Sequence, residues 1–242
     1  MSKYIGCNFN NGAYYGGIDS SFNRTFKDEE VLIESGIGDI VPCIIGNISE
    51  AYDILKRKIK EKNTNDFNTI CICVYETIEE YFNGINNISN RMKYYKPLDE
   101  IETKEDIGKV SSLKGTGAAM CTERAMLAQN LLKSLNINSF YKCSGIKKNG
   151  EIEVHSYNLI EHDNKYYIFD SSIPTVEDKK VTPLIATIPK EVFDKISSSE
   201  QRIGYSVEVS HYNPIRNNDV TIIYDSGREF TYYQEQNKNK QK

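Results

Sequence analysis

Residues 115–125 read Gly-Thr-Gly-Ala-Ala-Met-Cys-Thr-Glu-Arg-Ala, residues 153–157 read Glu-Val-His-Ser-Tyr, and residues 166–170 read Tyr-Tyr-Ile-Phe-Asp. These segments place Cys121, His155 and Asp170 in that order along the chain. This is one known order for a thiol nucleophile, its histidine base and the acid that orients the base. We therefore take this stretch as the chemical part of the chain and the rest as its scaffold.

The first segment opens a predicted helix. Small and apolar residues recur at steps of three and four, which predicts one inward helical face that ends near Asn136: Ala118, Cys121, Ala125, Ala128, Leu132 and Leu135. Cys121 lies on that face near the helix start, where a flexible glycine-containing approach and the helix dipole favour a thiolate. Glu123 opposes this effect if its carboxylate faces the same way.

Three β-like runs follow the helix, at 139–146, 151–160 and 165–172. Lys-Lys-Asn-Gly separates the first two runs and is a strong hairpin signal, and Glu-His-Asp-Asn (161–164) separates the last two. These runs predict consecutive antiparallel strands.

The second turn sets the register of His155 and Asp170. If 161–164 form the loop, the two residues lie directly opposite each other, with Cβ atoms about 5 Å apart. If only Asp163 and Asn164 form the turn, they are diagonal but still share a face. The same alternation places Lys142 and Ser144 on the His155 face. Cys143 falls on the other face, which makes it a poor nucleophile candidate.

Composition describes a polar globular protein. Of 242 residues, 39% are hydrophobic and 26% are charged, with 17 Tyr and no Trp. The net charge of −4 provides no basic field for nucleic acid or for acidic lipid, so we expect neither partner. We expect a loosely ordered lead-in at 1–46, a single domain at 47–234 with its core at 110–175, and a polar tail at 235–242.

The cysteine and histidine pattern predicts no metal site and no cofactor. The six cysteines contain no Cys-x-x-Cys, and the three histidines are scattered. The start resembles no signal peptide and no run of about 18 apolar residues occurs, so we expect a cytoplasmic protein with reduced thiols that does not span a membrane. We interpret Cys71 and Cys73 as buried core residues.

Further elements are expected on both sides of the central stretch. Helices are predicted at 49–62, capped by Asn47 or Ser49, and at 66–82, with a polar link at 83–109. Beyond the centre we expect a short helix at 188–196 with Pro189 near its start, and strands at 205–210 and 220–224. His211 is interpreted as a surface residue.

The chemistry of Cys121 requires a base and oxyanion donors. With His155 as base, a thiolate–imidazolium pair would attack an acyl carbon and form a thioester. One oxyanion donor could be the Cys121 backbone N–H, and the other could come from loop 114–120 or from Lys142.

The helix sequence Cys-Thr-Glu-Arg-Ala-Met-Leu, with the later Val-His-Ser-Tyr and Tyr-Tyr-Ile-Phe-Asp, resembles the core of the transglutaminase-like superfamily over about residues 110–175. The resemblance implies an α+β, papain-like core with helices packed on an antiparallel sheet. It assigns Cys121 as nucleophile, His155 as base and Asp170 as orienting acid. It also implies metal-free chemistry on a peptide or protein amide substrate: hydrolysis, deamidation or cross-linking.

The chain departs from the family pattern near the histidine and the aspartate. Tyr157 and Phe169 stand where the family often has Trp, and Asp-Ser-Ser replaces the common Asp-Pro. These departures bear on substrate preference more than on the triad.

Three functional hypotheses remain at this point. The favoured one is a cysteine hydrolase or acyltransferase of transglutaminase-like type, closer to a protease or amidase than to a cross-linking enzyme. The second is an arylamine N-acetyltransferase-like enzyme, whose triad has the same order. The third is a non-catalytic binding module that keeps the fold. The sequence leaves the oligomeric state open.

Overall fold

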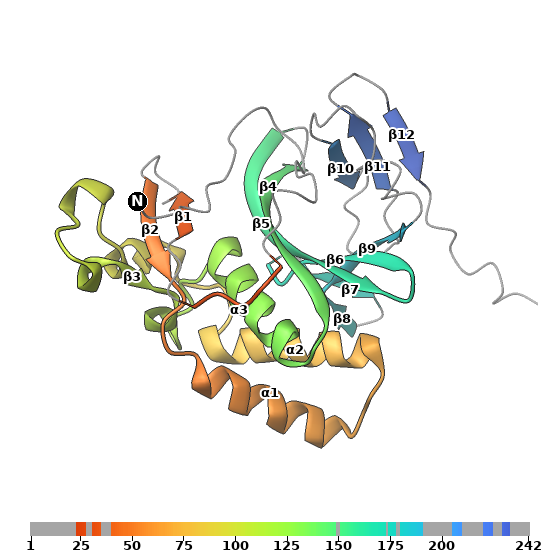
Figure 1. The fold of residues 1–242 in the computed structure, drawn as a ribbon, viewed down its shortest axis with the longest axis horizontal. Coiled ribbons are helices and arrows are strands. Elements are labelled where there is room, and N and C mark those ends of the chain that lie inside the picture. The colour runs from red at the N-terminus through yellow and green to blue at the C-terminus, as the bar shows by residue number, and fades with distance from the viewer. Residues whose placement is uncertain are drawn as a thin grey trace, which may run out of the picture. The chain divides into compact units, whose positions relative to one another are not determined.

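The computed structural model describes nine ranges of the chain: 23–27, 31–34, 40–148, 151–172, 174–177, 180–190, 205–209, 220–224 and 229–232. Of these, the residues up to 136 belong to one compact unit and those from 137 onward to a second. The described residues of both units contain strands, and those of the first include the α-helices α1, α2 and α3. The molecule therefore mixes helices with largely antiparallel sheets, consistent with the α+β class (Figure 1).

Helices α1 (Ser49–Lys62) and α2 (Phe67–Phe82) form a hairpin at the predicted positions (Figure 1). The predicted cap of α1 is wrong, because Ile48 is its N-cap residue; Asn47 still contributes by accepting the Ser49 N–H at 3.0 Å. At α2 the Asp66 side chain accepts the Thr69 N–H at 2.8 Å, the usual way of satisfying a helix-start amide.

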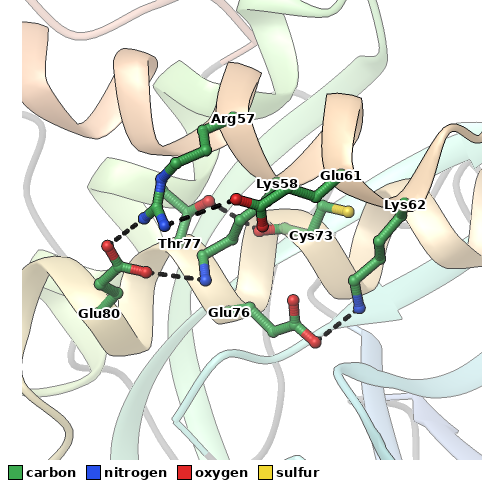
Figure 2. Close-up of polar contacts among 8 residues, drawn as sticks. All are labelled: Arg57, Lys58, Glu61, Lys62, Cys73, Glu76, Thr77 and Glu80. Atoms are coloured by element: carbon green, nitrogen blue, oxygen red, sulfur yellow. Dashed lines mark hydrogen bonds and ion pairs between the residues drawn. The ribbon is translucent and has the colours of Figure 1, made fainter.

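The two helices share an apolar interior and an exposed polar edge. Cys71 and Cys73 are fully buried, which confirms their interpretation as core residues, and burial raises the pKa of the Cys71 thiol to about 12. Figure 2 shows the edge, where Lys58 bonds to Glu80 at 2.8 Å. Lys62 bonds to Glu76 at 2.7 Å and Arg57 also reaches Glu80, so in the pairs that join the two helices α1 supplies the cations and α2 the carboxylates.

A small sheet and several 3-10 turns surround the rest of this unit. Strands β1 (Val31–Glu34), β2 (Ile40–Ile44) and β3 (Gly108–Lys109) form it in that order, with β1 and β2 antiparallel and β2 and β3 parallel. Strands β1 and β2 lie within the expected lead-in at 1–46. The Gly- and Asn-rich run at 8–17 precedes both strands, whose sequences Val-Leu-Ile-Glu and Ile-Val-Pro-Cys-Ile are mostly apolar.

The polar segment after α2 contains structure that its composition did not indicate. It holds the 3-10 helices η2 (Ile88–Tyr94), η3 (Leu98–Glu100) and η4 (Lys104–Asp106), and η5 (Val110–Leu113) follows β3. Arg91 of η2 is buried, with 2% of its side chain exposed. This segment therefore contributes to the interior and is more than a link.

Helix α3 (Cys121–Ser134) begins at Cys121 itself. The predicted single inward face is wrong, because every residue from Thr122 to Leu132 is buried. Ala118 precedes the helix and Leu135 caps its end. The polar residues of α3 are buried with partners: Arg124 bonds to Glu79, and the Asn130 side chain bonds to the Phe26 backbone.

The second unit contains a four-stranded antiparallel sheet in the order β4-β5-β6-β9 (Figure 1). Its strands are β4 (Asn138–Lys148), β5 (Glu151–His162), β6 (Lys165–Phe169) and β9 (Leu184–Pro189). The first three correspond to the predicted β-like runs. A two-residue turn joins β5 to β6, with His162 paired to Lys165 and with left-handed backbone at Asp163 and Asn164.

The turn decides between the two predicted registers. Asn158 pairs with Phe169, so His155 and Asp170 are offset rather than directly opposite. The four-residue loop is therefore wrong and the diagonal arrangement is confirmed. Asp and Asn tolerate the left-handed conformation, which explains why the tighter turn is available here.

The helix predicted at 188–196 is wrong for its first two residues, although the next residue, Lys190, is helical. Ile188 and Pro189 end strand β9, where they pair with Tyr166 and Lys165. β9 is an edge strand of the described sheet, and proline is tolerated there because no outer ladder bond is lost. Residues 191–196 of the predicted helix lie outside the described residues.

Smaller strand sets complete the second unit. Strands β7 (Thr175–Glu177) and β8 (Lys180–Thr182) form a hairpin, and β10 (Tyr205–Val209), β11 (Val220–Tyr224) and β12 (Glu229–Tyr232) form a three-stranded sheet. β10 and β11 confirm two predicted strands. His211 and the tail at 235–242 lie outside the described residues. Across the described ranges, no helix is long and apolar enough to cross a membrane.

Candidate active site

Cys121 is the one partly exposed thiol among the cysteines whose side chains the structure describes. Cys43, Cys71 and Cys73 are buried, and none of the four is in a disulfide. As the first residue of α3, Cys121 lies where helix amides and the helix dipole favour a negative charge. Its surroundings suit a reactive thiol better than those of the other three.

The loop that approaches Cys121, predicted to be flexible from its glycines, is tied to the end of α2 by backbone hydrogen bonds. The Gly115 and Gly117 amides donate to the Tyr81 and Phe82 carbonyls at 2.8 and 2.7 Å. Gly117 has φ +67°, and a Cβ atom there would lie 2.0 Å from the Asn86 side-chain oxygen. Glycine is therefore required where the loop passes over the end of α2.

Most backbone amides of loop 114–120 already have protein acceptors. Those of Lys114, Gly115, Thr116 and Gly117 bond to backbone carbonyls, that of Ala118 to the Thr116 hydroxyl, and that of Met120 to Glu123. Ala119 is fully buried. The loop is thus a poor source of an oxyanion donor, one of the options that the sequence left open.

Glu123 is fully buried within the first turn of α3. One carboxylate oxygen accepts from Arg91 Nε at 2.6 Å and from the Tyr95 hydroxyl at 3.0 Å. The other accepts the Met120 N–H at 3.1 Å, which ties the carboxylate to the residue before Cys121. The negative charge that we expected to oppose a Cys121 thiolate is therefore paired with a cation.

The pKa shifts around this pair follow from burial and from the carboxylate. Burial alone would lower the pKa of Arg91, but Glu123 outweighs it and the pKa is raised, with smaller contributions from Tyr95 and Cys121. Burial, reinforced by Glu123, raises the pKa of Tyr95 and of the Cys43 thiol well above their usual values. Arg91 thus stays charged, and the Tyr95 hydroxyl and Cys43 thiol stay protonated near neutral pH.

In the second unit, His155 Nε2 is hydrogen-bonded to Asp170 Oδ2. His155 is 5% exposed and Asp170 is 2% exposed. The other oxygen of Asp170 accepts the Ser172 N–H at 2.8 Å, and the Asp170 N–H donates to the Pro183 carbonyl at 2.8 Å. The aspartate is held on both sides, so it can fix the tautomer and orientation of the imidazole.

The strand register places further predicted residues around His155. Ser144 pairs with His155 and Lys142 pairs with Tyr157, so the predicted face of these two strands is confirmed. Cys143 pairs with Ser156, the alternate position. Lys142, Tyr157 and Phe169 are buried, and the last two fill the positions where the related family often has Trp.

The structure brings together two of the three predicted site residues within one unit, His155 and Asp170. Cys121 belongs to the other unit, where it starts α3. Sequence reasoning missed Arg91 and Tyr95. The available signal was Glu123, because a carboxylate on a buried helix requires a cation, but the sequence does not say which of many cations supplies it. Within the described ranges, no three His, Cys, Asp or Glu side chains cluster as metal ligands would.

A thiol at a helix start and a buried His–Asp pair, with the histidine on β5 and the aspartate directly after β6, suit cysteine-dependent chemistry. The family model for the transglutaminase-like domain matches residues 50–193, and the chain belongs to this family. The match includes Cys121, His155 and Asp170 and extends well beyond the stretch that carried the resemblance. No curated protein matches the chain.

Proposed function

We propose that the chain is a cysteine-dependent amide hydrolase or acyl transferase in which Cys121 is the nucleophile. The observation that carries the proposal is the His155–Asp170 hydrogen bond, formed by two buried residues of the predicted order. A histidine held by a carboxylate is the usual partner of a catalytic thiol. We also propose that the core has the papain-like arrangement of this family.

The roles follow from the bonded atoms. Because Nε2 of His155 bonds to Asp170, Nδ1 is the nitrogen that takes the thiol proton. The Cys121 thiolate attacks the carbonyl carbon of a peptide or protein amide, and the protonated His155 gives its proton to the departing amine. The C–N bond breaks and a thioester forms on Sγ. Water or an acceptor amine then attacks the thioester and restores the thiol.

Stabilisation of the oxyanion requires two donors. The Cys121 amide is the first, as the position of the residue at the helix start suggests. Because the amides of loop 114–120 are largely committed to protein acceptors, we propose Lys142 as the second. Its strand position beside Tyr157, on the His155 face of the hairpin, supports this assignment.

Trapping the thioester tests the proposal. The purified protein is mixed with peptides and proteins from a cell extract, quenched in acid and examined by mass spectrometry for acyl groups on Cys121. We expect acylation of Cys121, none in Cys121→Ala, and strong reduction in His155→Ala. Acylation by acetyl-coenzyme A alone would instead favour the acetyltransferase hypothesis. No acylation, together with unreactive Cys121, would favour the non-catalytic binding module.

A further inference from the structure

The buried Arg91–Glu123 pair lies directly behind the start of α3 and is not used by the triad chemistry. Its members come from different elements: Arg91 from η2 and Glu123 from the first turn of α3. Their side chains are 2% and 0% exposed. Burying a pair of charges is costly. The cap that Glu123 provides to the Met120 N–H explains its carboxylate but not the buried guanidinium of Arg91.

Glu123 connects this pair to the nucleophile through the backbone. It is two residues after Cys121, and residues two apart leave a helix on roughly opposite sides. Glu123 therefore faces Arg91 and Tyr95 in the interior rather than the thiol. Through its second oxygen it also holds the Met120 amide at 3.1 Å, which fixes the peptide that leads into Cys121.

The pair is also placed to act electrostatically on Cys121, because Glu123 is in the same first turn of α3 and Arg91 Nε lies 2.6 Å from its carboxylate. The Tyr95 hydroxyl, just after η2, donates to Glu123, and the charges of the pair also act on the thiols of Cys43 on β2 and Cys121 on α3. A negative charge on Cys121 contributes to the raised pKa of Arg91, so by reciprocity the guanidinium favours the thiolate. Glu123 has the opposite effect on the thiolate.

We propose that Arg91 and Glu123 are positioning residues that set the reactivity of Cys121 by opposing charges: Glu123 holds the start of α3 in place, and Arg91 neutralises the negative charge that this support introduces. The inference deepens the proposed function, because it concerns the same nucleophile. Glu123 alone would disfavour the thiolate, and Arg91 alone would favour it. Because their effects oppose each other, the pair leaves the electrostatic effect of the helix N-terminus on the Cys121 thiolate unchanged.

The pH dependence of Cys121 alkylation tests the proposal in four forms of the full chain: wild type, Arg91→Met, Glu123→Gln and the double variant. Iodoacetamide labelling is followed by mass spectrometry at each cysteine. We expect the apparent pKa of Cys121 to rise by about one unit in Arg91→Met and to fall by about one unit in Glu123→Gln. The double variant should return close to the wild-type value.

The opposite signs separate the proposal from a merely structural role. Loosening of the helix start would move both single variants in the same direction, and that result would overturn the proposal. Arg91→Lys keeps the charge and should remain near wild type. Arg57→Met removes an exposed cation of the α1–α2 edge and should leave Cys121 unchanged. If Arg91→Met does not fold, the test uses wild type, Glu123→Gln and the double variant. An apparent pKa of Cys121 that is unchanged in Glu123→Gln would then contradict the proposal.

Failure of this inference and failure of the proposed function are distinguishable. If His155→Ala raises the apparent pKa of Cys121 but neither Arg91→Met nor Glu123→Gln moves it, the triad stands and the charge balance is wrong. If the single variants shift it with opposite signs but His155→Ala has no effect, the charge balance stands and the proposed base is wrong.

Discussion

Two ion-pair systems in the first unit use the same chemical groups in opposite surroundings. On the α1–α2 edge, Lys62 and Glu76 are 35% and 36% exposed (Figure 2). Behind α3, Arg91 and Glu123 are 2% and 0% exposed. Water screens the Lys62–Glu76 pair, and if that ion pair breaks, both groups are hydrated. If one member of the Arg91–Glu123 pair is removed, the other remains as an unpaired buried charge. The edge can therefore tolerate change that the start of α3 cannot.

The largest expected effect comes from breaking the buried pair on one side. Arg91→Met should lower the free energy of unfolding by about 3–5 kcal/mol, because the Glu123 carboxylate stays buried without its cation. Lys62→Met, the matched change on the exposed edge, should lower it by less than about 1 kcal/mol. Urea unfolding followed by circular dichroism measures both. Equal losses would show that burial does not distinguish the two systems.

The double variant sharpens this comparison. Arg91→Met combined with Glu123→Gln removes both charges. The single side-chain oxygen of glutamine can still accept the Met120 N–H, and its NH2 group can donate to the Tyr95 hydroxyl oxygen. We expect it to be more stable than Arg91→Met alone, since buried pairs can often be replaced by neutral groups of similar volume. If adding Glu123→Gln to Arg91→Met lowered the free energy of unfolding further, the unpaired Glu123 charge would not be the reason that Arg91→Met is destabilising.

A second, smaller effect concerns the loop that leads into α3. Gly117→Ala should destabilise the protein by about 2 kcal/mol, because it combines a left-handed backbone with a Cβ atom 2.0 Å from the Asn86 oxygen. Gly115→Ala is the matched control: φ is +70°, but no atom lies within 4 Å of its Cβ position, so we expect about 1 kcal/mol. Thermal unfolding compares the two. If Gly115→Ala were the more harmful change, crowding against Asn86 would not be the reason for the glycine.

The smallest expected effect is the acid response of Asp106, a partly exposed carboxylate. A hydrogen bond from Lys96, with others from Thr103, lowers the pKa of Asp106 to about 2. Its folded-state pKa is below the unfolded value of about 3.9, so it adds stability above pH 4 that is lost as the pH falls toward 2. Asp106→Asn should reduce the slope of melting temperature against pH in that window. An unchanged slope would exclude this carboxylate as a contributor.

The features that could be predicted from the sequence are those that depend on the spacing of neighbouring residues. The bounds of α1, the position of Cys121 near a helix start, and the shared face of His155 and Asp170 follow from periodicities that depend on near neighbours. The exact register did not follow, because the choice between the two turns depended on left-handed backbone at Asp163 and Asn164. Strand β9 was missed because Pro189 reads locally as a helix start, although pairing with β6 decides its conformation.

The residues that surround α3 could not be predicted from the spacing of residues along the helix. A stripe of small residues predicted one inward face, but α3 is buried almost all round because distant groups satisfy its polar side chains. Arg91 is 32 residues from Glu123 along the chain. Its segment contains several cations of similar local context, and only the fold selects one. A buried carboxylate near a candidate nucleophile indicates that a cation is needed without identifying it.

The most direct test of the account measures the apparent pKa of Cys121 by iodoacetamide labelling across pH, in wild type and in His155→Ala. The buried Cys71, whose pKa is raised to about 12, serves as an internal unreactive thiol. We predict a value for Cys121 well below about 8.5 that rises toward an ordinary thiol pKa in the variant. Ordinary reactivity in wild type, unchanged by His155→Ala, would contradict the assignment of Cys121 as an activated nucleophile.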